Sequence, residues 1–164
     1  MSKPVLWIVI PCYNEEQVLP ITAPMFLEKI HSLTAQGLVS DKSRVLFVND
    51  GSRDKTWELI QGFAAQDEHY IGISQIYYVE IQDHLLLYHT DMGRIEAWGK
   101  LSDVEAELDT YNFARCSSSH LVNMQHITSV SKTEVIVGST KLPISQRKHK
   151  AFCDRVIAYL NKTS

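Results

Sequence analysis

The sequence is poor in the features that mark a disulfide-rich, metal-binding or membrane-spanning protein. Its three cysteines (Cys12, Cys116 and Cys153) are odd in number, widely spaced and outside any C-x-x-C pair, which favours a reducing compartment. No regular Cys/His ligand spacing occurs, so we predict no metal site and no cofactor. The apolar run at residues 4–11 is too short to span a bilayer, and no charged segment with a cleavage site precedes it. We therefore expect a cytoplasmic protein without a membrane span.

What the sequence does contain is a strongly uneven charge. The 164 residues suit one domain or two very small ones, and the net charge is only −3. Residues 1–75 carry −3 and residues 76–114 carry −6, whereas residues 115–164 carry +6. A basic end of this kind is typical of a surface that meets an anion, although a solvated basic helix would give the same count.

The first 75 residues alternate between apolar strands and helical patterns. VLWIVI (Val5–Ile10) is a continuous apolar run, as expected for a strand buried on both faces of a parallel sheet. Gly37 can end the helix that follows, and Asp54 can cap the next one. The order is strand 5–10, helix 15–36, strand 44–48, a helix after residue 54, and strand 70–74. This βαβαβ order predicts a parallel sheet whose loops gather at the carboxyl ends of the strands.

Two motifs stand out in this half, IVIPCYNEE and, after it, RVLFVNDGSRDKTWELI. Together they resemble the start of a family 2 glycosyltransferase over about residues 4–74, and they are most similar to the branch of dolichol-phosphate mannosyltransferases and bactoprenol glucosyltransferases. The resemblance implies half of a GT-A, Rossmann-like sheet that binds a nucleotide-sugar. It further implies that the base and ribose lie against Pro11, Tyr13, Asn14 and Glu15, with Asp50 accepting hydrogen bonds. Taken singly, the Asn49–Ser52 segment is more often a plain turn, and Tyr13 is more often a packing residue.

The catalytic part of that family is missing. Its D-x-D motif, which binds the metal on the diphosphate, occurs nowhere in the chain. The acids Asp103, Glu105 and Glu107 fit the solvated face of an amphipathic helix instead. Whether the chain is an enzyme is left open, and the missing motif argues against it.

From Ile76 the pattern changes to short strands with turn signals between them. It predicts strands at 76–81, 84–90, 94–99, 120–124, 127–131, 134–138 and 141–145, a helix at 102–108, and antiparallel meanders. A last helix is predicted at Gln146–Leu160, with Phe152, Val156, Ile157 and Leu160 on one face.

Four sequence blocks stand out in this half and occur in order over about residues 76–160: IYYVEIQDHLLLYHT, GKLSDVEAEL, FARCSSSHLVNMQHITSV and LPISQRKHK. Together they resemble the LytTR family, the DNA-binding output domain of many bacterial response regulators. The resemblance implies a mainly β fold, with a short helix and a C-terminal helix, that inserts loops into successive major grooves. It also implies that an opening strand of the family is replaced here by the glycosyltransferase-like half.

The same blocks predict the residues that meet DNA. By resemblance, the base contacts are His84, Ser118 and Arg147, and an arginine is well suited to a guanine edge. Phosphate contacts are predicted for Arg115, Lys148, His149 and Lys150, together with Lys141. Asn123 is expected to bond the backbone rather than DNA.

We thus expect a two-part α+β chain, with a truncated nucleotide-binding unit at 1–75 and a DNA-binding domain at 76–164. Three functions remain open: a sequence-specific transcriptional regulator, a glycosyltransferase relative that keeps nucleotide-sugar binding, or a non-functional fusion fragment. Because no Gly/Ser/Pro linker separates the parts, strand Tyr70–Ser74 is expected either to run straight into Ile76–Ile81 or to pair in a homodimer. A homodimer on double-stranded DNA is the further option.

Overall fold

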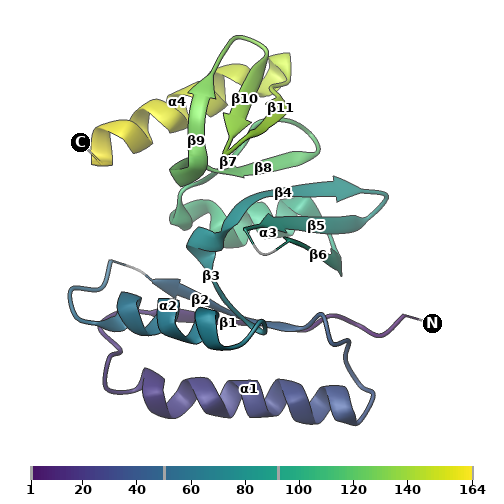
Figure 1. Cartoon of the computed structure of the whole chain (residues 1–164). Coiled ribbons are helices and arrows are strands. Elements are labelled where there is room, and N and C mark those ends of the chain that lie inside the picture. Colours follow the sequence, from purple (N-terminus) through teal and green to yellow (C-terminus); the bar gives the residue numbers. More distant parts are fainter. Residues whose placement is uncertain (1, 50, 92, 164) are drawn as a thin grey trace. The chain divides into compact units, whose positions relative to one another are not determined.

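The computed structural model of the chain describes every residue except Met1, Asp50, Met92 and Ser164. The chain forms two compact units, Met1–Gln75 and Ile76–Ser164, which Figure 1 shows in purple to teal and in teal to yellow. No helix within the described residues is long and apolar enough to cross a membrane.

The first unit is a parallel sheet with two helices. Strand β2 lies between β1 and β3 and pairs in parallel with both. The elements follow one another along the chain as strand, helix, strand, helix and strand. Their bounds are β1 Trp7–Cys12, α1 Leu19–Ala35, β2 Arg44–Asn49, α2 Thr56–Gln66 and β3 Tyr70–Gly72, followed by the short 3-10 helix η1 at Ile73–Gln75.

Both helices pack on one face of this sheet. Ile8 and Ile10 of β1 and Phe47 of β2 share an apolar cluster with residues of α1 and α2. Val9, which points to the other face, is 48% exposed. The prediction that the first strand is buried on both faces is therefore wrong, because β1 is an outer strand of the sheet and α1 and α2 pack on a single side.

The ends of α1 follow the sequence signals in part. Gly37 adopts a left-handed φ of 74°, and the N–H groups of Gly37 and Leu38 donate to carbonyls in the last turn of α1. This is the Schellman arrangement, so the predicted helix end is confirmed. The start lies at Leu19 rather than Glu15, because residues 15–18 form a turn that leads into Pro20 in the first turn of the helix.

The predicted strand 70–74 ends at Gly72. The 3-10 helix η1 interrupts the extended backbone, and a new strand, β4, begins at Ile76. The chain therefore does not run as one long strand from Tyr70 to Ile81. In addition, the Gly72 N–H donates to the side chain of Gln75 at 2.8 Å, so this edge group already has a partner within the chain.

The second unit contains two antiparallel sheets, which confirms the predicted meanders. One sheet has the order β6-β5-β4-β8-β7, and the other has the order β11-β10-β9. Their strands are β4 Ile76–Gln82, β5 Leu85–Thr90, β6 Gly93–Trp98, β7 Phe113–Arg115, β8 His120–Asn123, β9 Ile127–Val130, β10 Glu134–Val137 and β11 Thr140–Pro143. The helices are α3 Leu101–Leu108 and α4 Gln146–Thr163, with the short 3-10 turns η2 Asp109–Tyr111 and η3 Met124–His126. Strand β7 was not predicted, since three residues are too few to show alternation.

Helix α4 packs on the core through a different face from the one predicted. Phe152 and Val156 are buried, and Tyr159 packs against the same cluster. Ile157 and Leu160 are more than half exposed, so their predicted place on the buried face is wrong. At about 100° per residue, Tyr159 lies nearly above Phe152, whereas Ile157 lies about 140° around the helix.

Candidate nucleic-acid interface

The first predicted contact residue, His84, lies at the tip of the β4–β5 hairpin. Asp83 and His84 form a two-residue loop, and both have left-handed φ angles, 48° and 69°. Such angles are typical of the type I′ turn that joins tightly twisted antiparallel strands. The His84 carbonyl accepts the Gly99 N–H at 3.2 Å, while its side chain is exposed.

The second predicted contact residue, Ser118, lies on the loop between β7 and β8. Ser118 is exposed, whereas its neighbour Ser117 is 7% exposed and Cys116 is fully buried. The Ser117 hydroxyl accepts the Ser119 N–H at 3.2 Å, which closes the loop into a tight turn. The loop therefore presents one serine outward and uses its neighbour for internal bonding.

Arg115 has several partners at the base of this loop. Its Nε donates to the Ser117 carbonyl at 2.9 Å, and one Nη donates to the Ser118 carbonyl at 2.7 Å. The other Nη donates to the Glu105 carboxylate on α3, also at 2.7 Å. The side chain is only 17% exposed. The guanidinium thus fixes the loop that carries Ser118, and its predicted contact with phosphate stays a prediction.

The third group of predicted residues lies at the start of α4. Arg147 and Lys150 are exposed on its first turns, and Lys141 is exposed on β11. Lys148 is half-buried and lines a 240 Å³ pocket together with Glu105 and other charged residues. Arg147, Lys150 and Lys141 are therefore the cations of this group that are most free to reach an anion.

Backbone hydrogen bonds bring the three predicted segments to one end of the five-stranded sheet. The Ile81 N–H, near the end of β4, donates to the Ser119 carbonyl at 3.0 Å. This bond joins the His84 hairpin to the loop between β7 and β8 (residues 116–119), which we call the serine loop. The Ser145 N–H donates to the Cys116 carbonyl at 2.9 Å, which joins the serine loop to the start of α4. Residues that are far apart in the sequence thus form one exposed edge of the second unit.

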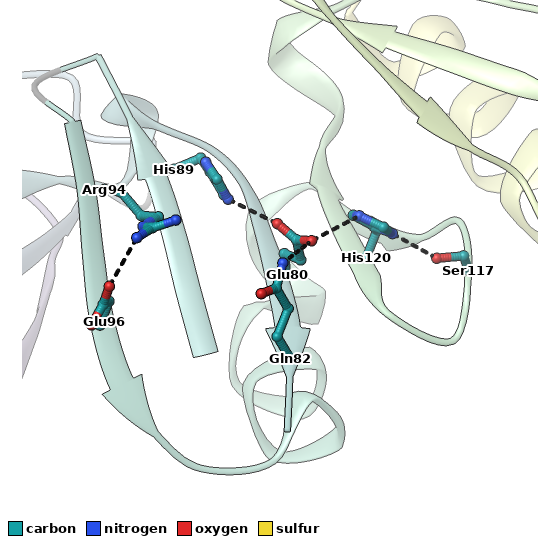
Figure 2. A network of polar contacts seen from close by, with 7 residues as sticks. All are labelled: Glu80, Gln82, His89, Arg94, Glu96, Ser117 and His120. Atoms are coloured by element: carbon teal, nitrogen blue, oxygen red, sulfur yellow. Dashed lines mark hydrogen bonds and ion pairs between the residues drawn. The ribbon is translucent and has the colours of Figure 1, made fainter. Parts of the chain in front are cut away.

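Behind this edge lies a polar network that the sequence reasoning did not single out. Figure 2 shows the Glu80 carboxylate on β4 between His89 of β5 and His120 of β8. Its oxygens lie 3.1 Å from His89 Nε2 and 3.8 Å from His120 Nε2. On the far side of the ring, His120 Nδ1 lies 2.9 Å from the Ser117 hydroxyl, so the network ends in the serine loop.

Two residues of this network, His120 and Glu80, have lowered pKa values. Burial lowers the pKa of His120 below its ordinary value, although the nearby Glu80 charge acts in the opposite direction. Burial by itself would raise the pKa of Glu80, but hydrogen bonds from Gln82 and His89 lower it overall. Both directions favour a neutral His120 beside a charged Glu80. A signal for this network was present in the sequence. Tyr78 and Glu80 are two residues apart on β4 and therefore lie on the same face of the sheet, and His89 of β5 pairs with Tyr78.

Asn123 confirms its predicted structural role. It is 2% exposed, and its side-chain amide donates to the Ile76 carbonyl at 2.9 Å. Its side-chain oxygen accepts the Gln125 N–H at 3.1 Å. The residue bonds the backbone at both ends, where β4 begins and where β8 ends.

In the first unit, the loops with the nucleotide-binding motifs lie next to each other at the carboxyl ends of β1 and β2. The Asn14 side chain accepts the Arg53 N–H at 2.8 Å, and the Asn14 N–H donates to Ser52. The Glu15 N–H donates to the Thr56 hydroxyl at 2.8 Å. These bonds fix the two loops to each other, and they occupy the Asn14 side-chain oxygen with the Arg53 backbone and the Asn14 N–H with the Ser52 hydroxyl.

The other predicted nucleotide residues are placed as follows. Tyr13 is 56% exposed beside this loop pair, and Pro11 is exposed at the end of β1, opposite Val48. Glu15 is half-buried. Asp50, the predicted acceptor, lies outside the described residues.

Comparison with known proteins gives two families. A model of the glycosyl transferase family 2 matches residues 7–76, and a model of the LytTr DNA-binding domain matches residues 67–156. The two matches overlap at residues 67–76, which include β3 and η1. The second match therefore starts before Ile76, where the resemblance had been expected to begin.

Two individual relatives illustrate these matches. An uncharacterized glycosyltransferase, YkoT, of Bacillus subtilis strain 168 is 48% identical over 59 residues, which are 36% of this chain and 18% of that protein. The chain thus spans about a fifth of the length of this relative. The solved LytTr DNA-binding domain of a Bacillus cereus protein, described as a methyl-accepting/DNA response regulator, is 22% identical with a TM-score of 0.47. That likeness covers 51% of this chain and 82% of the other.

The LytTr match extends over more than half of the chain and includes the whole five-stranded sheet, the serine loop and most of α4. It also includes each residue singled out above for contact with DNA. The chain therefore belongs to the family of LytTr DNA-binding domains.

Proposed function

We propose that this chain is a cytoplasmic transcriptional regulator that binds double-stranded DNA in a sequence-specific manner. The observation that carries the proposal is the edge formed by the His84 hairpin, the serine loop and the start of α4. These three segments are joined by backbone hydrogen bonds and expose His84, Ser118 and Arg147 together. A rigid set of loops of this kind suits major-groove contacts, because base readout requires donors in fixed positions.

Charge supports the same edge. The segment from Arg115 to the end of the chain carries +6, and Arg147, Lys150 and Lys141 are exposed in it. We assign phosphate contacts to Lys150, Lys141 and Lys148, and a base contact to Arg147. With three phosphates neutralised, log Kd should rise with log salt by a slope of about 3.

The test begins with selection of a site from random duplexes, followed by anisotropy titrations of the full chain at several KCl concentrations. Binding with the expected salt slope supports the proposal. Absence of binding even at low salt would refute it, and the chain would then stand as a fusion fragment without DNA-binding activity.

The specific role of Arg147 has its own test. Arg147→Ala should weaken binding to the selected site by about 1–3 kcal/mol and relax the base preference at one position. Lys150→Ala is the matched control, and it should weaken binding to selected and random DNA equally. If Arg147→Ala also weakens both equally, Arg147 contacts phosphate rather than a base.

Whether the protein acts as a homodimer is a separate part of the proposal. A dimer through β3 has little support, because the Gly72 N–H is already bonded to Gln75. We favour association on DNA, where two copies would occupy neighbouring half-sites. Light scattering of the free chain and of its DNA complex would distinguish a dimer in solution from one that forms on DNA.

A second candidate function is nucleotide-sugar binding by the first unit. It is favoured by the hydrogen bonds between the two motif loops at the carboxyl ends of β1 and β2, since ligands of open α/β sheets bind there. Calorimetry with UDP, GDP and their sugars tests it. Saturable binding that is lost in Asp50→Ala would support it, and a lack of heat with every nucleotide would refute it.

A further inference from the structure

Three side chains with metal-binding atoms converge in the first unit. His31 lies on α1, Asp67 directly follows α2, and His69 directly precedes β3. One ligand atom from each residue lies within 4.8 Å of the other two. We propose that His31, Asp67 and His69 together bind one divalent transition-metal ion of the zinc class.

Two of the ligands are already fixed relative to each other. Asp67 Oδ1 lies 2.8 Å from His69 Nδ1 and accepts the His69 N–H, also at 2.8 Å. The His31 ring meets the His69 ring edge-on, with centroids 5.1 Å apart and an angle of 85° between the planes. Because Asp67 and His69 are ordered by these bonds, little further ordering is required when an ion binds.

The donor set selects the class of ion. Two imidazole nitrogens and one carboxylate oxygen suit zinc, nickel, cobalt or copper, whereas magnesium and calcium prefer oxygen ligands throughout. Zinc bonds of about 2.1 Å place tetrahedral ligand atoms about 3.4 Å apart. The Asp67–His69 pair, at 2.8 Å, must therefore open slightly as its hydrogen bond gives way to the ion, and the exposed side chain of His31 can rotate toward the same point. Three protein ligands leave a fourth position for water.

A bound ion would connect α1 to the segment that joins α2 and β3. That segment is tied to the sheet, because the His69 carbonyl accepts the Val45 N–H of β2 at 2.7 Å. The site lies at the amino ends of β2 and β3, whereas the nucleotide-binding motifs lie at the carboxyl ends of β1 and β2. The expected effect is stabilisation of the first unit, and the proposal depends on neither of the functions above.

The chain contains a second pair of metal-binding atoms that any experiment must separate from this site. On α4, His149 Nε2 lies 3.7 Å from Cys153 Sγ. A histidine and a cysteine four residues apart on a helix can bind zinc by themselves, although with two protein ligands rather than three.

The test is calorimetric titration of the full chain with ZnCl2, together with thermal unfolding with and without the ion. We expect one zinc ion per chain and an increase in the unfolding temperature of the first unit. His31→Ala removes one of the three ligands, so zinc binding should weaken by more than the roughly tenfold that loss of a supporting group costs at a metal site, and the thermal shift should be lost with it. Because His31 is exposed, this substitution should leave the fold intact. Substitution with Co2+ should give a visible absorption band that His31→Ala removes.

The matched controls are His84→Asn, an exposed histidine in the other unit, and Cys153→Ser, which disrupts the pair on α4. Neither should change zinc binding at the proposed site. If binding is unaffected by His31→Ala, if it disappears with Cys153→Ser, or if zinc does not bind, the proposal is wrong. Circular dichroism of each variant shows whether a loss of binding comes from unfolding.

Discussion

Replacing Arg115 with alanine should weaken DNA binding without removing a contact to DNA. The guanidinium donates to the carbonyls of Ser117 and Ser118 and to the carboxylate of Glu105, at 2.7 to 2.9 Å. Because Glu105 and Ser118 are partly exposed, we take each bond at about 1 kcal/mol, so the variant should lose about 3 kcal/mol of unfolding free energy. Part of this loss is ordering of the loop that carries Ser118. DNA affinity should therefore fall by about 1–2 kcal/mol, or roughly 5- to 30-fold.

The assay is an anisotropy titration of wild type and Arg115→Ala at several KCl concentrations. A residue that only positions the loop leaves the number of phosphate contacts unchanged, so the salt slope should be the same in both proteins. A direct phosphate contact would instead reduce the magnitude of the slope by about 0.9. Glu105→Gln gives the complementary result, because it removes a partner of Arg115 and one negative charge. If Arg115 positions the loop, the DNA affinity of Glu105→Gln should be equal to that of wild type or lower, because the loop is less well held. If Arg115 contacts phosphate, the DNA affinity should be higher, because the guanidinium is released from the carboxylate.

Arg155→Ala is the matched control for lost stability. Arg155 also makes three hydrogen bonds, to the Asp109 carboxylate, the Asp109 carbonyl and the Phe113 carbonyl, at 2.6, 3.0 and 2.9 Å. Its removal should destabilise the second unit by a similar amount while the serine loop keeps its bonds. A reduced salt slope in Arg115→Ala, or an equal loss of DNA affinity in Arg155→Ala, would refute the positioning role.

Three further predictions concern the interior of the chain. Asn123→Ala leaves the Ile76 carbonyl and the Gln125 N–H without their side-chain partner, so urea unfolding should show a loss of about 2–4 kcal/mol; a loss below 0.5 kcal/mol on the same scale would contradict the structural role. His120 should titrate below 6.5 when its ring proton is followed by NMR, since burial lowers its pKa. The contribution of neutral His120 to the unfolding free energy is complete above pH 6.5, and it is lost as the pH falls from there through the pKa of the folded state. The lowered pKa of Glu80 adds a second loss of stability below about pH 4.5. An unfolding free energy that rises on acidification would contradict both. Burial raises the pKa values of Cys12 and Cys116 to about 11, so iodoacetamide at pH 8 should modify the half-buried Cys153 first, and equal rates at all three thiols would show that the native chain opens easily.

Local patterns in the sequence were enough to predict most elements and both family resemblances. Apolar runs and turn residues placed most strands within two residues, and Gly37 marked the end of α1. The motifs IVIPCYNEE and FARCSSSHLV identified the two families before any geometry was known, because they are local patterns. The acids Asp103, Glu105 and Glu107 predicted an amphipathic helix, and the apolar residues Leu101, Val104 and Leu108 of α3 are buried.

The contacts that the predicted site residues make within the chain became visible only in the folded structure. Arg115 was predicted to meet phosphate, yet its guanidinium is engaged by Glu105 and by the serine loop. The contact with Glu105 depends on how α3 packs beside β7, which no local pattern contains. Likewise, His31 and His69 are 38 residues apart, so no ligand spacing rule could pair them, and the packing of α1 against the α2–β3 connection brings them together. Local periodicity fixes which residues form a helix or strand, but long-range strand pairing and helix packing determine which of their polar atoms are free to bind a ligand.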